Sequence, residues 1–316
     1  MTPILSAGRV ALLLSVLAGF GLQSCFTGIE STPRIGESEL RRQHVTVTAE
    51  QEFLSDIRSD RPSLWMPGKK YYVTDSKINL IFTSASTGTD SLEGEVITFC
   101  RFDRIPAVDN NNAAEAVFTH GNDTLFWRPG IDADSLASRS RLDIPFTIDL
   151  DLIDSVRSRM AGNTYYITTP LWYDPATMQP TGGLRHIAVE ITDVRPGTAA
   201  MPFNVVFRPQ APYGSGQERS VLMTVGEGRL ATRNFHRLFT FDNPRRRYPA
   251  ITDDVWNLII HSKVREGMSR DECRLALGAP DQIIHGSGTL ATSERWSYPD
   301  GVYLIFEDGY LVRFRQ

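Results

Sequence analysis

The chain has 316 residues, of which 41% are hydrophobic and 22% are charged, and its net charge at pH 7 is −4. This length allows two or three small domains, and the mildly negative charge argues against nucleic acid as a partner. After the first segment of the chain, no apolar run reaches the roughly 20 residues that a membrane-spanning helix needs.

An apolar run at the start of the chain, residues 10–22, follows Arg9 and leads into the letters LQSC, which end at Cys25. The run is too short for a spanning helix and has the length of the hydrophobic region of a secretory signal. The letters resemble the lipobox of bacterial lipoproteins. This resemblance implies cleavage after a signal peptide, residues 1–24, and a mature chain that begins at lipidated Cys25, with palmitate among its acyl chains. The alternative is a soluble exported protein in which the cysteine occurs by chance.

The segment that follows, residues 25–47, is polar and broken by glycine and proline, so we expect it to form a tether. Phe26 comes directly after the cysteine, in the place where an aspartate would signal retention. This pattern resembles sorting to the outer membrane, and we expect the anchored protein to face the periplasm.

A first domain is predicted over residues 48–140, with a short helix followed by strands. Thr48 and Gln51 match a capping box at the start of the helix. The apolar face of this helix is expected to consist of Phe53, Leu54 and Ile57. Strand patterns follow as KYYVT, INLIFT, GEVITFCRF, EAVFT and TLFWR, and the letters HGND between the last two are typical of a hairpin turn.

A second domain is predicted over residues 141–240, where the helix pattern LDLIDSVRSRM, capped by Asp151, precedes a similar series of strands. The letters G-x-x-YY begin the strands of both domains, at Gly68 and again at Gly162. We interpret the two as related small β-domains that curl into compact barrels of the Src-homology-3 type. A chance recurrence of the glycine and the two tyrosines is the alternative.

The last part of the chain, residues 250–316, combines two helix patterns with strands. Thr252 is placed to cap the first helix, and Ser269 with Glu272 forms a capping box at the second. Gly278 follows the second helix, where a left-handed cap is expected. Two strand patterns, ERWSY and VYLIFEDGYLVRF, come next, and the letters DG break the latter into a hairpin.

These letters form an ordered series: a glycine–methionine–serine turn, a leucine–glycine–x–proline stop, a tryptophan–x–tyrosine strand and a final hairpin. The positions concerned are Gly267, Met268, Ser269, Leu277, Gly278, Pro280, Trp296, Tyr298, Phe306, Asp308 and Gly309. The series, over about residues 252–316, resembles the SmpA/OmlA (BamE-like) outer-membrane lipoprotein domain. The resemblance implies a helix pair packed on a small antiparallel sheet, and it brings no catalytic residues with it. The predicted fold class is therefore mainly β, with an α+β C-terminal domain.

Motifs of enzymatic chemistry are missing from the letters of the sequence. The six histidines are far apart, and neither a nucleophile elbow nor a phosphate-binding loop occurs. Cys100 and Cys273 fit core positions of a strand and a helix, although an oxidising compartment would permit a disulfide. We predict no catalytic, cofactor-binding or metal-binding residue. The expected function is that of a non-catalytic envelope lipoprotein that binds or scaffolds an envelope or outer-membrane protein. The alternative is an envelope hydrolase or cell-wall-modifying enzyme whose site is assembled from distant residues.

A basic turn precedes the C-terminal domain, with Arg245, Arg246 and Arg247 between Pro244 and Pro249. Because proline restricts the backbone, we expect a stiff segment that holds the three charges outward. They are candidates for contact with a partner or with an anionic surface. The alternative is a solvated turn without a binding role.

Overall fold

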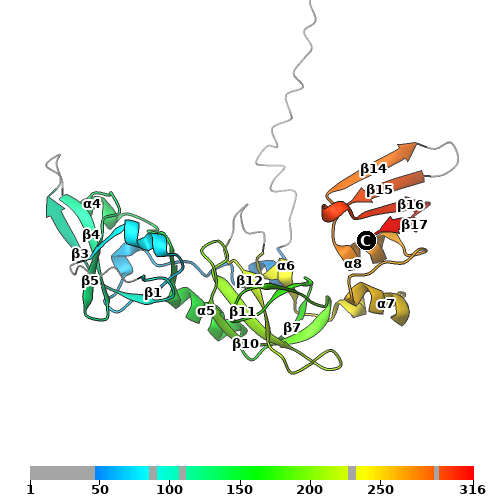
Figure 1. Ribbon diagram of the computed structural model, residues 1–316, viewed down its shortest axis with the longest axis horizontal. Coiled ribbons are helices and arrows are strands. Elements are labelled where there is room, and N and C mark those ends of the chain that lie inside the picture. Colours follow the sequence, from blue (N-terminus) through cyan, green and yellow to red (C-terminus); the bar gives the residue numbers. More distant parts are fainter. Residues whose placement is uncertain (1–46, 85–90, 107–111, 227–232, 288–291) are drawn as a thin grey trace, which may run out of the picture. The chain divides into compact units, whose positions relative to one another are not determined.

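The protein is described by a computed structural model (Figure 1). The described residues are 47–84, 91–106, 112–226, 233–287 and 292–316. Residues 48–316 form one compact unit, whose described residues are mainly β and form three curled antiparallel sheets. The predicted fold class is thus confirmed at the level of a mainly β chain.

The first sheet has six strands in the order β2-β5-β4-β3-β1-β6. Its strands are β1 (Lys70–Val73), β2 (Phe82–Ser84), β3 (Val96–Pro106), β4 (Asn112–His120), β5 (Asp123–Trp127) and β6 (Thr147–Asp149). Helical turns accompany them at η1 (Pro62–Leu64), η2 (Ser76–Leu80) and α4 (Ala133–Leu136). The predicted hairpin between β4 and β5 is confirmed. The letters INLIFT were expected to form a strand, but their first half lies in η2, because Asp75 caps a 3₁₀ turn there.

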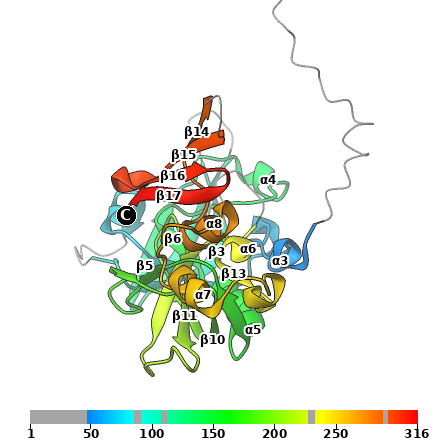
Figure 2. The same ribbon diagram turned by 90° about the vertical axis from the view of Figure 1, so that its right-hand side faces the viewer.

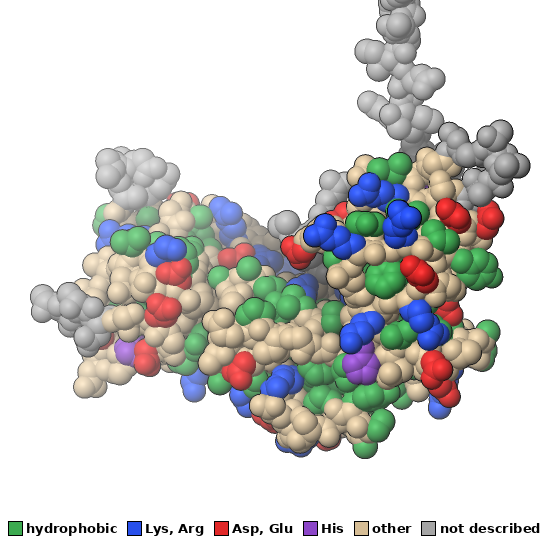
Figure 3. All heavy atoms as spheres, turned by 45° about the vertical axis from the view of Figure 1, so that its right-hand side comes forward, with side chains coloured by type: hydrophobic (Ala, Val, Ile, Leu, Met, Phe, Trp, Pro, Cys, Tyr) green, Lys and Arg blue, Asp and Glu red, His purple; other side chains and the backbone are tan. Residues whose placement is uncertain are grey.

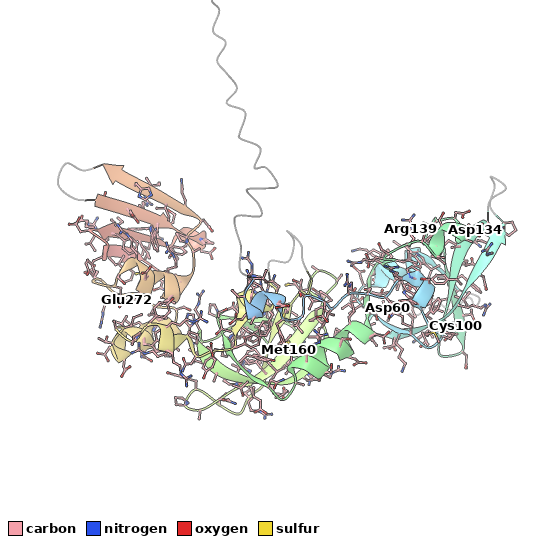
Figure 4. All side chains as sticks on the ribbon, turned by 180° about the vertical axis from the view of Figure 1, so that it is seen from behind. Asp60, Cys100, Asp134, Arg139, Met160 and Glu272 are labelled. Carbon is pink, nitrogen blue, oxygen red and sulfur yellow. The ribbon has the colours of Figure 1, made fainter. Side chains whose placement is uncertain are left out.

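The second sheet has seven strands in the order β13-β7-β10-β11-β12-β8-β9. Its strands are β7 (Thr164–Ile167), β8 (Leu171–Tyr173), β9 (Pro180–Gly182), β10 (Ile187–Pro196), β11 (Phe203–Pro209), β12 (Arg219–Met223) and β13 (Phe239–Thr240). The helices beside them are α3 (Ala49–Glu52), α5 (Leu150–Met160) and α6 (Phe235–Leu238). Figure 4 labels Met160 at the end of α5, where its side chain is fully buried.

The two sheets repeat one arrangement of strands. The order β6-β1-β3-β4-β5-β2 of the first corresponds to β13-β7-β10-β11-β12-β8 of the second, where β9 is added at the edge. The long strands bulge at corresponding places, at Cys100 in β3 and at Thr192 in β10. Thr74 and Thr168, directly after β1 and β7, each bond through amide and hydroxyl to carbonyls next to β6 and β13. The recurrence seen in the letters therefore extends to strand order and backbone bonding.

Two details of the first helices differ from the predictions. The capping box of Thr48 and Gln51 is present, but α3 ends at Glu52, because Phe53 is extended, with a ψ of 126°. Leu54 then takes a positive φ of 66°. Helix α5 has the predicted bounds, yet its cap is Asp149 rather than Asp151. The carboxylate of Asp149 accepts a bond from the Asp151 amide at 3.0 Å, while the Asp151 side chain pairs with a lysine instead.

The third sheet has the order β14-β15-β16-β17; α8 lies beside it, α7 packs on α8, and both helices share a core with the sheet (Figure 2). Its elements are α7 (Asp253–Ile260), α8 (Arg270–Leu277), β14 (Gln282–Ser287), β15 (Thr292–Ser297), η4 (Pro299–Gly301), β16 (Tyr303–Glu307) and β17 (Tyr310–Arg315). The cap of α7 by Thr252 is confirmed, as are the capping box of α8 and the hairpin at Asp308. Figure 4 labels Glu272, which completes that capping box. The sequence did not predict β14.

Among the described residues, the buried side chains form two cores rather than three. One core fills the first sheet, whereas the other runs from the second sheet through α7 and α8 to the third sheet. The loop before β10 joins these parts. There the Arg185 amide donates to Ile260 at the end of α7, and the His186 ring contacts the Leu275 carbonyl of α8 at 3.1 Å. Strand β6 belongs to the first sheet although it lies in the range predicted for the second domain.

Candidate functional site

The outer face of the third sheet carries three arginines, which the register of the strands brings together. Directly paired residues of neighbouring strands lie on the same face of a sheet. In one row, Arg295 of β15 and Arg313 of β17 flank Ile305 of β16, and in the next row Arg315 lies opposite Tyr303. We call these five residues the arginine face. By standard strand spacings, Arg313 and Arg315 are about 7 Å apart, and Arg295 lies about 10 Å from Arg313.

The charges of this face are not neutralised within the described part of the chain. Its three arginines are exposed, and none forms an ion pair with another described residue. The Arg295 guanidinium lies 5.1 Å from the ring centroid of Tyr303, at a distance that allows a cation–π contact. Tyr303 and Ile305 are half-buried, so apolar surface lies between the positive charges. Figure 3 shows one face of the molecule, on which arginine and lysine side chains lie among hydrophobic and acidic ones.

The opposite face of the same sheet is packed and bonded, which fixes the strands that carry the arginines. Trp296 and Leu304 are buried there, and the Arg274 guanidinium of α8 lies 5.0 Å from a ring centroid of Trp296. The indole nitrogen of Trp296 donates to Glu294 at 3.1 Å, and Glu294 also pairs with Arg270 at 3.0 Å. The arginines of this face therefore lie on strands of a packed sheet rather than on a loop.

The side chains of this face are chemically suited to contact with anions. A guanidinium group is planar, stays charged at all physiological pH values and offers paired donors that match a carboxylate or a phosphate. Arginine therefore supplies no general base at neutral pH. The arrangement can hold two or three acidic groups at defined spacings, and it contains no pair of groups suited to proton transfer.

Arg245 of the predicted basic turn has a structural role. Its guanidinium donates to the carbonyl oxygens of Tyr248 and Ile251, pairs with Asp253 at 3.1 Å and lies 5.2 Å from a ring centroid of Trp256. The expectation that all three arginines point outward is therefore wrong for Arg245. Proline restricts the backbone of the turn, but it does not prevent a long side chain from folding back onto the following segment.

The other predicted site residues are Arg246, Arg247 and Cys25. Arg246 and Arg247 are exposed on η3 (Pro244–Arg247), as expected for a solvated turn or a contact surface. Cys25, the predicted lipidation site, lies outside the described residues. Its modification stays a prediction from the letters of the sequence.

Arg295, Arg313 and Arg315 were not among the residues predicted from the sequence to form a site. The letters YLVRFRQ contain a signal, because arginine alternates with apolar residues and alternate residues of a strand share a face. The contribution of Arg295 could not be found in this way. It depends on the pairing of β15 with β16, which joins residues from separate parts of the chain.

A hollow in the first sheet, with a volume of about 330 Å³, is mostly apolar. Trp65, Phe102 and Leu136 line it together with Cys100, whose thiol is free and half-buried (Figure 4). The Cys100 sulfur has contacts of 3.7 Å and 3.8 Å with a backbone oxygen and a threonine hydroxyl. Arg101 also lines this hollow, but no described histidine lines it as a base for the thiol. Cys273 is also free and buried, as expected.

A buried charge cluster lies beneath the first sheet. The ammonium of Lys69 lies 2.9 Å from Asp149 and 2.5 Å from Asp151, and the side chains of Lys69 and Asp149 are 3% and 7% exposed. Burial by itself lowers the pKa of Lys69, but the hydrogen bonds to the two aspartates outweigh it, so the pKa is raised. Burial raises the pKa of Asp149 more than Lys69 lowers it. Because Asp149 also caps α5, this cluster has a structural role.

Within the described part of the chain, the arginine face is the most direct indication of a binding role. No group of three or more histidine, cysteine, aspartate or glutamate side chains is placed to hold a metal ion among the described residues. In the same part of the chain, no helix combines the length and the apolar character needed to cross a bilayer. Comparisons with protein-family models, curated proteins and solved structures gave no match.

Proposed function

We propose that this protein is a non-catalytic lipoprotein of the cell envelope that acts as a binding or scaffold module at the outer membrane, including a role in envelope assembly. The observation that carries the proposal is the arginine face, a supported and uncovered surface whose charges have no partner among the described residues. Its chemistry suits binding rather than catalysis. An envelope or outer-membrane protein is the proposed partner.

The anchor is proposed to be a lipid on Cys25. Support comes from the apolar run and the letters LQSC, from the polar segment that follows, and from Phe26 after the cysteine. A tether of residues 25–47 would extend at most about 80 Å from the membrane, at about 3.5 Å per residue. The proposed location is the periplasmic side of the outer membrane.

The finer fold assignments are proposed as well. We infer that the two β-domains are related copies of one Src-homology-3-type unit, because strand order, bulge position and threonine bonding recur in both. We also propose that residues 250–316 are a BamE-like domain. Its support is the helix pair α7 and α8 with a four-stranded antiparallel sheet, together with the ordered letters described above.

Metabolic labelling with a palmitate analogue, followed by membrane fractionation, tests the anchor. We expect the wild-type chain to carry the label and to sediment with outer membranes, whereas Cys25→Ala loses both properties. Cys100→Ala is the matched control, because it removes a free cysteine that does not follow an apolar run. Equal labelling of wild type and Cys25→Ala would overturn the lipoprotein proposal.

A further inference from the structure

We propose that the arginine face docks an extended acidic segment of a partner protein of the cell envelope. This inference rests on the proposed binding function and names the chemistry of the partner. The first support is charge complementarity. Arg295, Arg313 and Arg315 are exposed, share one sheet face and lack ion-pair partners among the described residues. Carboxylates suit them, because a guanidinium group binds a carboxylate through two parallel hydrogen bonds.

The spacing of the arginines favours an extended segment over a single small anion. Arg313 and Arg315 are alternate residues of β17, about 7 Å apart, which is also the spacing of alternate side chains in an extended peptide. Such a segment can present successive acidic side chains to both arginines. Arg295, two strands away, lies on the far side of Ile305 and Tyr303 and widens the positive surface beyond the footprint of one carboxylate.

The apolar centre of the face gives the segment a second kind of contact. Tyr303 and Ile305 are half-buried between the charges, and Ile284 of β14 continues the Ile305 row with 48% of its surface exposed. A segment with apolar residues among its acidic ones would cover this surface while its carboxylates meet the arginines. The partner chemistry is therefore acidic and apolar in combination.

A local acidic segment fits better than a broad anionic membrane surface. The chain as a whole has a net charge of −4. At distances larger than the separation between its charged groups, an anionic bilayer interacts with this net charge rather than with the three arginines, and it repels the protein. A short segment can engage the three arginines without bringing other negative charges close. In the neighbouring row, Glu307 lies opposite Tyr310. Its negative charge would repel acidic residues of a partner at that end of the arginine face.

The test uses the full-length protein and a fluorescent ten-residue peptide, ESESVSESES, which is long enough to span the sheet. In its extended form, one face carries glutamates about 7 Å apart around a central valine, so carboxylates and an apolar side chain meet the arginine face together. Binding is measured by fluorescence anisotropy, and the same peptide with lysine in place of each glutamate is the charge-reversed probe. We expect the acidic peptide alone to bind. Its affinity should fall as salt is raised from about 50 mM to about 500 mM, because exposed charges are then screened.

Two triple variants locate the site. R295Q/R313Q/R315Q should weaken binding of the acidic peptide more than about tenfold, since each exposed pair contributes a factor of about two to five. The matched control, R58Q/R61Q/R139Q, removes the same charge from exposed positions elsewhere, of which Arg139 is labelled in Figure 4. It should change the affinity less than about twofold. Unchanged circular dichroism and melting temperature establish that both variants fold.

Three results would overturn the inference: unchanged binding by the arginine-face variant, an equal loss in both triple variants, or binding that ignores salt. Vesicles of phosphatidylglycerol provide the competing ligand class. If the protein binds them more tightly than the peptide, and loses that binding in R295Q/R313Q/R315Q, the face recognises a membrane surface instead. Because the peptide assay needs no lipid on Cys25, its outcome is independent of the labelling experiment.

Discussion

At the scale of single residues, the decisive feature is where charged side chains are neutralised. Lys69 and Arg245 both look like surface residues in the sequence, yet each is bonded inside the fold. Arg295, Arg313 and Arg315 are the opposite case, because they remain exposed and unpaired among the described residues. Lys69 and Arg245 therefore have structural roles, whereas the three arginines of the arginine face are available for contact with a ligand.

Replacing Lys69 by methionine should lower the free energy of unfolding by about 3–5 kcal/mol, because Asp149 is left as a buried charge without its partner. Urea denaturation followed by circular dichroism measures the change. Lys70→Met is the control, since Lys70 is exposed, and it should stay within about 0.5 kcal/mol of wild type. Equal stability of the two variants would show that the cluster contributes nothing to folding.

Arg245→Gln should lower the free energy of unfolding by about 2 kcal/mol, because bonds from a charged donor to two backbone carbonyls are lost. Arg246→Gln and Arg247→Gln remove the same charge from exposed positions and should each stay within about 0.5 kcal/mol of wild type. The three variants can be compared in one thermal melting series. An equal shift in all three would contradict the structural role assigned to Arg245.

At the scale of elements, short segments are specified by their ends. The capping boxes at Thr48 and Ser269 and the hairpin at Asp308 all form as the letters predict. Gly278 shows where such reasoning needs refinement. Its φ of 89° is positive as expected, but its ψ of −168° places it outside the left-handed helical region, in a conformation that essentially only glycine adopts.

Gly278→Ala should therefore lower the free energy of unfolding by about 1–3 kcal/mol through backbone strain. Crowding is not the cause, because an added Cβ would meet only the Arg185 guanidinium, at 3.8 Å. Gly182→Ala is the control, since Gly182 has open space around it and no positive φ. The measurement is urea denaturation of the full chain. If Gly278→Ala were as stable as Gly182→Ala, the strain argument would fail.

At the scale of the whole molecule, the second and third sheets share one core, and the loop before β10 joins them through the helix ends. Basic side chains favour helix C-termini, where the carbonyl groups carry partial negative charge. Arg185 and His186 occupy this place at α8, with contacts to the carbonyls of Leu277 and Leu275. The stability of the C-terminal part is therefore coupled to that of the second sheet.

Burial, together with the nearby Arg185 charge, lowers the pKa of His186 despite its hydrogen bond to the Leu275 carbonyl. A lowered pKa means that the unfolded chain binds the proton first. The stability from neutral His186 is therefore present above the ordinary histidine pKa of about 6.5 and is lost as pH falls through the folded-state pKa.

The variant His186→Asn tests whether this titration affects stability, because asparagine does not titrate and tolerates the positive φ of 57° at this position. Urea denaturation is measured at about pH 7.5, 6 and 5, on either side of the ordinary histidine pKa. Wild type should lose more stability than His186→Asn on acidification. Parallel losses in the two proteins would show that His186 does not titrate with folding.

The sequence by itself determined the local features of this protein: the caps at Thr48, Thr252 and Ser269, the hairpin turns and the mainly β character. Each of these features depends on residues that are close together in the sequence, so it can be predicted from the sequence. The lipid anchor at Cys25 is a prediction from the sequence. Only the tertiary structure decided that Arg245 folds inward and that arginines from β15 and β17 share one face. The shared face depends on strand register, and the place of Arg245 depends on how the following segment turns back toward its side chain, so that Tyr248, Ile251 and Asp253 come within reach. Residue patterns encode neither.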